Sequence, residues 1–91
     1  MAESGQITVT TAGTAVQGTD VDGMLFLISA HPDNTDTVWI GNDGSSDVTN
    51  ANGFPLQPTG APIPMGVVNL DRLWFDADMS GEKICWLKIQ A

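Results

Sequence analysis

The chain has 91 residues, with 11 acidic side chains against only three basic ones and a net charge of −8. This length leaves room for one domain with a thin core, and oligomerisation is a common source of extra stability for such domains. Phosphate binding depends on clustered lysine and arginine, so the acidic balance argues against nucleic acid and anionic membranes as direct partners. The single cysteine excludes a disulfide within the chain.

The N-terminal segment shows no sign of export. Residues 1–6 lack the basic start and apolar stretch of a secretory signal peptide. The longest apolar run, residues 24–28, is far shorter than the ~20 residues of a membrane-spanning helix. We therefore expect a soluble protein made in the cytoplasm, with residues 1–91 forming one β domain and residues 1–5 forming a flexible N-terminal arm.

Short strand-like segments recur along the chain, and helix signals are nearly absent. Strands are expected at residues 6–10, 14–17, 24–30, 37–41, 66–70, 73–76 and 83–89, with a further short one near Val48. A turn cluster at residues 31–34 predicts that 24–30 and 37–41 form a hairpin. The prolines in this part of the chain predict short, extended, edge-like segments with tight turns, within an ordered loop at residues 53–64. The fold class is therefore all-β, a single small β-sandwich or β-barrel (jelly-roll-like) with an extended N-terminal segment.

Several of these strands carry apolar side chains on both faces. In residues 83–89, Ile84 and Trp86 share one face, while Cys85, Leu87 and Ile89 share the other. A small sandwich has one interior, and an unpartnered tryptophan would expose about 150–250 Å², at a cost of several kcal/mol. We predict that this surplus lies at intermolecular contacts, with the interface residues Ile7, Val9, Trp39, Phe54, Trp74, Trp86, Leu87 and Ile89. The alternative is that the N-terminal segment or the proline-rich loop covers these side chains.

The sequence offers little from which to build a catalytic site. His31, the single histidine, precedes a proline and acidic turn residues, as expected of a loop. Cys85 lies in an apolar strand and is expected to be a buried, inert thiol. Asp20 and Asp22 resemble the start of a calcium loop but lack its later ligands, which leaves calcium binding open. We expect a non-enzymatic protein with no catalytic residue, no cofactor and no specific metal ligand.

Four segments together carry a resemblance to a known family: residues 7–17 (ITVTTAGTAVQ), 32–41 (PDNTDTVWIG), 52–58 (NGFPLQP) and 68–77 (VNLDRLWFDA). In pattern and order they resemble the small capsid decoration or cement proteins of tailed bacteriophages. The resemblance implies a virion structural protein on the outer capsid surface that binds the major capsid protein between capsomers. It also implies a homo-oligomer, either a dimer or a trimer, and residues 60–66 depart from the pattern.

A second reading places the chain in a different functional class. An exposed tryptophan such as Trp39 or Trp74 could stack on a sugar, as in a carbohydrate- or receptor-binding module of a phage tail or fibre. A decoration protein should remain with emptied heads, whereas a binding module should bind glycans in isolation.

Overall fold

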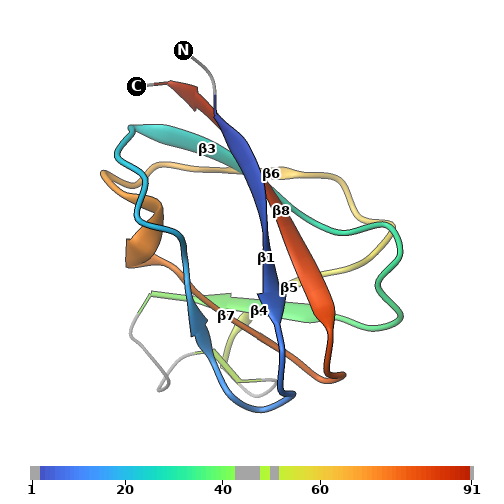
Figure 1. Ribbon diagram of the computed structural model, residues 1–91. Helices are drawn as coiled ribbons and strands as arrows, with labels where there is room; N and C mark the ends of the chain where they lie inside the picture. The colour runs from blue at the N-terminus through green and yellow to red at the C-terminus, as the bar shows by residue number, and fades with distance from the viewer. Residues whose placement is uncertain (1–2, 43–47, 50–51, 91) are drawn as a thin grey trace.

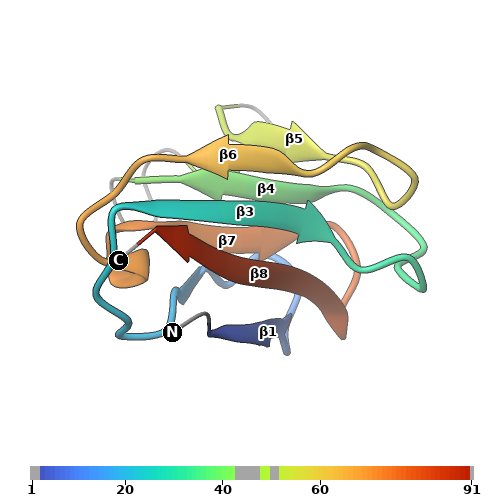
Figure 2. The same ribbon diagram turned by 90° about the horizontal axis from the view of Figure 1, so that it is seen from above.

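The computed structural model describes residues 3–42, 48–49 and 52–90, and these form two antiparallel four-stranded sheets packed face to face. The first sheet has the order β1 (Ser4–Val9), β8 (Glu82–Gln90), β3 (Leu25–Ala30) and β6 (Ile63–Met65). The second has the order β2 (Val16–Gln17), β7 (Trp74–Ala77), β4 (Val38–Gly41) and β5 (Phe54–Leu56). Figures 1 and 2 show the two layers from directions at right angles. The predicted all-β sandwich is confirmed.

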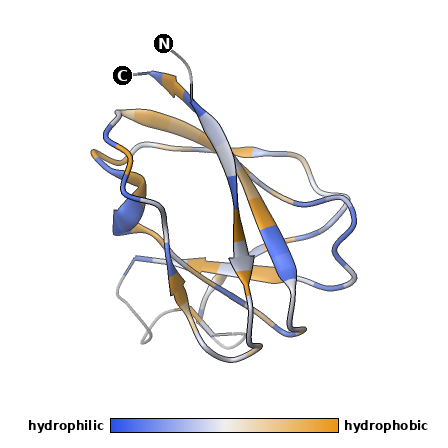
Figure 3. Cartoon of the chain, viewed as in Figure 1, coloured by the Kyte–Doolittle hydropathy of each residue, from blue (hydrophilic) through white to orange (hydrophobic). Residues whose placement is uncertain are grey.

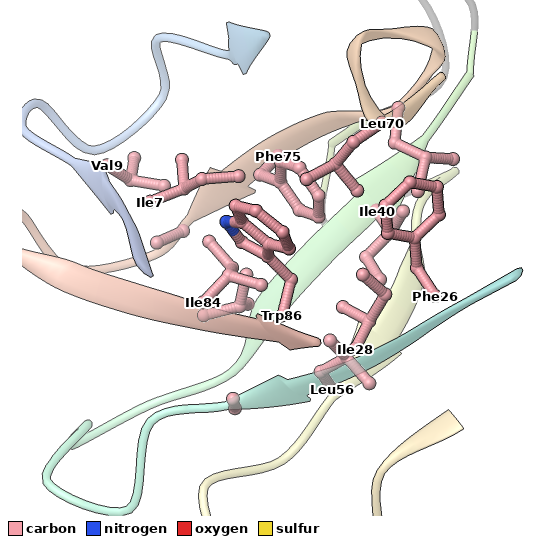
Figure 4. Close-up of a cluster of buried hydrophobic side chains, with 14 residues drawn as sticks. Ile7, Val9, Phe26, Ile28, Ile40, Leu56, Leu70, Phe75, Ile84 and Trp86 are labelled. Carbon is pink, nitrogen blue, oxygen red and sulfur yellow. The ribbon is translucent and has the colours of Figure 1, made fainter. Parts of the chain in front are cut away.

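The core lies between the two sheets, and buried residues alternate along β1, β3, β4 and the first part of β8. In β8, Ile84 and Trp86 point inward and are at least nine-tenths buried. Phe26 meets the Trp86 indole edge to face, with 6.2 Å between ring centroids. Figure 4 shows Trp86 among side chains from both sheets, with its nitrogen on the side of Ile7. The other buried apolar members are Val9, Ile28, Ala30, Val38, Ile40, Leu56, Leu70, Leu73, Phe75 and Ala77.

The predicted hairpin between residues 24–30 and 37–41 is wrong, because β3 and β4 belong to different sheets. The intervening turn is bonded to the start of β8 instead. The Asn34 side chain donates to the Lys83 carbonyl at 2.8 Å and accepts from the Lys83 backbone N–H at 2.9 Å. The His31 N–H also donates to the Lys83 carbonyl. The segment is thereby held at the end of the first sheet, from which the chain crosses to the second (Figure 1).

A buried carboxylate fixes the same crossing. Glu82 is 5 % exposed, and both of its carboxylate oxygens accept the Thr35 backbone N–H, at 3.0 and 3.1 Å. The Thr35 hydroxyl donates to Oε1 at 2.7 Å. Hydrogen bonds of this kind compensate a buried carboxylate for the water that it loses. Glu82 and Asn34 therefore position the crossing, and sequence reasoning identified neither.

The middle of the chain contains short, extended edge segments, as its prolines predict. These segments are the two edge strands β5 and β6, which lie at the start and the end of the ordered loop expected at residues 53–64. Val48 is buried but is not part of a strand. The strand expected at 66–70 is replaced by an isolated bridge between Asp22 and Asn69 and by a short 3-10 helix, η1 (Leu70–Arg72). Asn69 caps this helix by accepting the Asp71 N–H.

The first strand begins earlier than predicted. It takes in Ser4 and Gly5, which were assigned to the arm, and pairs them with Leu87 and Trp86. The Glu3 carbonyl also accepts the Lys88 N–H at 2.7 Å. The rest of the predicted arm, residues 1 and 2, lies outside the described residues.

Candidate interaction surfaces

The eight predicted interface residues divide into three groups. The predicted interface positions Ile7, Val9 and Trp86 need correction, because these side chains are at least nine-tenths buried in the chain's own core. Trp39 and Trp74 are half-buried on the outer side of the second sheet. Phe54, Leu87 and Ile89 are exposed by 57, 39 and 45 %. The strand at residues 84–89 thus has two apolar faces, as predicted. The face with Ile84 and Trp86 lies in the core, and the face with Leu87 and Ile89 is exposed.

The outer side of the first sheet carries a connected apolar surface. Leu87 lies opposite Leu27 in the pairing of β8 with β3, and Leu27 lies opposite Pro64 in the pairing with β6. Directly opposed side chains on one face of a sheet are near neighbours. A groove of about 210 Å³ runs here, lined by Leu27, Ser29, Pro62, Cys85, Trp86 and Leu87. We define the outer apolar face as Leu27, Cys85, Leu87 and Ile89; Figure 3 shows β3 coloured as hydrophobic along most of its length.

The outer side of the second sheet holds two tryptophans at diagonal positions. Trp39 pairs with Asp76, and Trp74 pairs with Gly41. The Trp39 indole N–H donates to the Asp78 carboxylate at 3.2 Å. The chain at Gly53 approaches so closely that a Cβ there would lie 2.9 Å from the Trp39 Cβ. Trp39 is thus partly covered by its own chain.

A larger cleft of about 590 Å³ opens where β5 and β6 form neighbouring edges of the two sheets. Its walls are mostly apolar: Ile40, Gly41, Asn42, Asn52, Phe54, Ile63, Pro64, Met65, Gly66, Val67 and Leu73. Phe54 is the predicted interface residue at its rim. The sequence did not indicate this cleft, because its two edges come from strands that were expected to be a loop.

His31 and Cys85 lie in different elements, the first in the turn after β3 and the second in β8. His31 lies in the expected turn, where its Nδ1 accepts the Asp33 backbone N–H at 3.0 Å. Cys85 was expected in the core but is half-buried on the outer apolar face. Burial raises the pKa of the Cys85 thiol, with the nearby Lys83 ammonium acting in the opposite direction. The thiol is therefore protonated at neutral pH, when it is a weak nucleophile.

The candidate calcium carboxylates converge on a hydrogen-bond donor. The Asn69 amide nitrogen donates to Asp20 at 2.8 Å and to Asp22 at 2.9 Å. The Asn69 side-chain oxygen accepts the N–H groups of Val21 and Asp71. In the part of the chain that the structure describes, no three His, Cys, Asp or Glu side chains gather as a metal site would require. The two aspartates hold a loop in place.

Comparison with protein-family models, with curated proteins and with solved structures found no match to this chain. Within residues 3–42, 48–49 and 52–90, no helix has the length and apolar character needed to cross a bilayer. The fold and surfaces therefore define the class of the protein, a small all-β sandwich with one apolar sheet face turned outward.

Proposed function

We propose that this protein is a structural module that binds an assembled protein shell, and that the shell is the capsid of a tailed phage. The observation that carries the proposal is the outer apolar face, where Leu27 and Leu87 oppose each other on neighbouring strands. Apolar area exposed to water costs about 25 cal/mol per Å², and a contiguous patch is typical of contact sites between proteins. The choice of a phage capsid as the shell rests on the resemblance of the four sequence segments.

Shell binding suits the size and chemistry of this surface. A groove of about 210 Å³ offers a modest contact area. A decoration protein binds at many equivalent positions of one lattice, and contacts within an oligomer add to one another through effective concentration. The same weak contact can therefore hold a module firmly on a shell while leaving it soluble when free.

The carbohydrate-binding alternative has weaker support. Sugar stacking needs an open aromatic face, and Trp39 is half-buried, with Gly53 close to its Cβ. Its indole N–H is already donated to Asp78. Trp74 is half-buried beside Gly41 and Gln17. The exposed apolar side chains of the first sheet therefore support protein binding better than the two tryptophans support sugar binding.

The test is attachment to heads assembled from the major capsid protein of the genome that encodes this chain. Leu87→Lys places a charge in the centre of the outer apolar face, and we expect it to lower occupancy on sedimented heads at least tenfold. Met79→Lys is the matched control, since Met79 is 51 % exposed and lies in the turn between β7 and β8. The control should bind as the wild type does. Equal occupancy of both variants, or no attachment of the wild-type chain, would exclude the proposal.

Glycan binding is the readout for the second reading. Trp74→Ala and the wild-type chain are titrated against a panel of bacterial surface glycans. Binding that disappears in Trp74→Ala would replace the shell proposal with the carbohydrate one.

A further inference from the structure

The four outer edges of the two sheets are not equally protected against pairing with another strand. The edge β2 has only two residues, and the edges β5 and β6 have Pro55 and Pro64 at their centres. Very short edge strands and prolines are the usual protections of a sheet edge. The edge β1 has six residues and no proline. Among the described strands it is the one long unprotected edge, and Figure 2 shows it at the border of the first sheet.

The protection at β6 is directional. The His31 N–H donates to the Lys83 carbonyl. The backbone N–H and C=O of residue 31 therefore point toward β8. Backbone groups alternate in direction along an antiparallel strand, so Phe26 and Ile28 face β6. Their partners Met65 and Ile63 direct their backbone groups back toward β3. Pro64 lies between them, so its backbone points away from β3 toward the free edge. The position whose backbone points to the free edge therefore has no N–H to offer.

The same reasoning shows that β1 keeps its outward donors. The Lys88 N–H donates to the Glu3 carbonyl, which places Glu3 in a hydrogen-bonded pair with β8. Because the direction of the backbone groups alternates, Gly5, Ile7 and Val9 also direct their N–H and C=O groups toward β8. Ser4, Gln6 and Thr8 consequently direct both N–H and C=O away from β8, toward the open edge.

The charge along this edge favours a second copy of the chain. Residues 4–9 contain no charged side chain, although the chain carries a net charge of −8. On the neighbouring strand, Lys83 lies opposite Thr8, and Lys88 forms an ion pair with Glu3 at 3.6 Å. Two copies that meet at β1 therefore bring together an edge without charged side chains, and this limits their repulsion although each chain is strongly acidic.

We propose that β1 pairs antiparallel with β1 of a second copy, about a two-fold axis at Gln6, so that two first sheets become one continuous sheet. In this register Gln6 lies opposite Gln6 of the second copy, and Ser4 lies opposite Thr8. The outward groups then form about six backbone hydrogen bonds. A two-fold contact of this kind is self-complementary and closed, so assembly stops at a dimer.

The dimer is independent of shell binding and is tested without a shell. Native mass spectrometry and light scattering follow the wild-type chain from about 1 µM to 1 mM, a range that covers weak to moderate affinities. We expect a transition from 9.6 kDa to twice that mass. Amide exchange at residues 4, 6 and 8 should slow as the concentration rises, because these N–H groups become bonded only in the dimer.

Gln6→Pro is the principal variant. The N–H of residue 6 points to the open edge, so a proline there removes a donor to the second copy. The hydrogen bonds between β1 and β8 are kept. The variant thus gives β1 the same protection that Pro64 gives to β6. We expect the dimer to disappear across the whole concentration range. Retained near-ultraviolet circular dichroism of the tryptophans would show that the variant is folded.

A charge pair keeps the test decisive if Gln6→Pro does not fold. Gln6→Glu and Gln6→Lys each place like charges opposite one another and should weaken the dimer several-fold. Mixing the two variants should restore a dimer that contains one copy of each. Thr59→Glu adds the same charge at an exposed turn and should dimerise as the wild type does. A wild-type chain that stays monomeric throughout, or a dimer that these Gln6 variants leave unchanged, would overturn the proposal.

Discussion

Gly5 lies directly against the indole of Trp86. The two residues are partners in the pairing of β1 with β8, and a Cβ at Gly5 would lie 2.9 Å from Cζ2 of the indole and 3.0 Å from its Nε1. The indole can therefore extend over β1 only because residue 5 has no side chain. Its Nε1 is buried, with no hydrogen-bond partner among the described residues, so packing alone holds the ring at this position.

Gly5→Ala should therefore destabilise the protein, although alanine is the better residue in a strand interior by backbone entropy. The added methyl group must displace a ring that is already packed against Phe26. Overpacking of this kind costs about 1–3 kcal/mol. The measurement is the urea midpoint followed by tryptophan fluorescence. Gly66→Ala is the control, because its Cβ would meet only an ordinary contact at 3.8 Å; equal midpoints for the two variants would contradict the prediction.

Glu82→Gln should loosen the crossing from the first sheet to the second. The glutamine keeps the shape of the side chain but replaces one acceptor oxygen with an NH₂ group that faces the Thr35 donors. Hydrogen bonds to charged groups contribute about 1.5–3 kcal/mol, so a loss of that order is expected. Hydrogen exchange should localise it to residues 31–37. Asp33→Asn, in the exposed part of the same turn, is the matched change and should leave the stability within about 0.5 kcal/mol of the wild type.

The apolar alternation of the sequence predicted the strands well, and the partners of those strands poorly. Trp86 and Leu87 were correctly placed on opposite faces of one strand, since that depends only on the period of two. The sheet in which β4 lies is set instead by contacts between distant residues, such as its pairing with β7 and the hydrogen bond from Asn34 to Lys83, 49 residues away in the sequence. A cluster of turn-forming residues has the same sequence pattern in a hairpin and in a connection to another sheet. The local sequence therefore could not distinguish a hairpin from a crossing between sheets.

The same limit applies to the candidate surfaces. Prolines at positions 55 and 64 indicated short edge-like segments within a loop but not their partners, because a proline fits a strand only at an edge where its missing N–H does no harm. That condition depends on the register of the finished sheet. Which of the two apolar faces of residues 83–89 is inside also depends on the sheet that covers it, and this explains why Trp86 was wrongly assigned to an interface while Leu87 was correctly placed on the opposite face.

Asn69→Asp tests the role of the two aspartates beside it. The substitution removes the amide that donates to Asp20 and Asp22 and adds a third carboxylate to the group. We expect the variant to be less stable than the wild type by about 1–3 kcal/mol, since two paired oxygens lose their donor and like charges are brought together. Its melting temperature should rise when Ca²⁺ is added, because three carboxylates suit a hard cation. The wild type should show no such rise, and a Ca²⁺-dependent shift in the wild type would instead identify a calcium site in the native loop.

The reactivity of Cys85 gives a prediction on pH. Burial raises the pKa of its thiol, so the folded protein holds this proton at a pH where the unfolded chain has released it. The contribution of this group to stability is therefore complete below the pKa of an unfolded cysteine and is lost as the pH rises through the pKa of the folded state. Alkylation by iodoacetamide should accordingly be slower in the folded protein at pH 7–8, and its rate should level off at a higher pH, than in the chain unfolded with guanidinium. Lys83→Met should slow alkylation further, because Lys83 is the group that lowers this pKa; a folded protein that reacts as fast as the unfolded chain at every pH would show that the thiol is not protected.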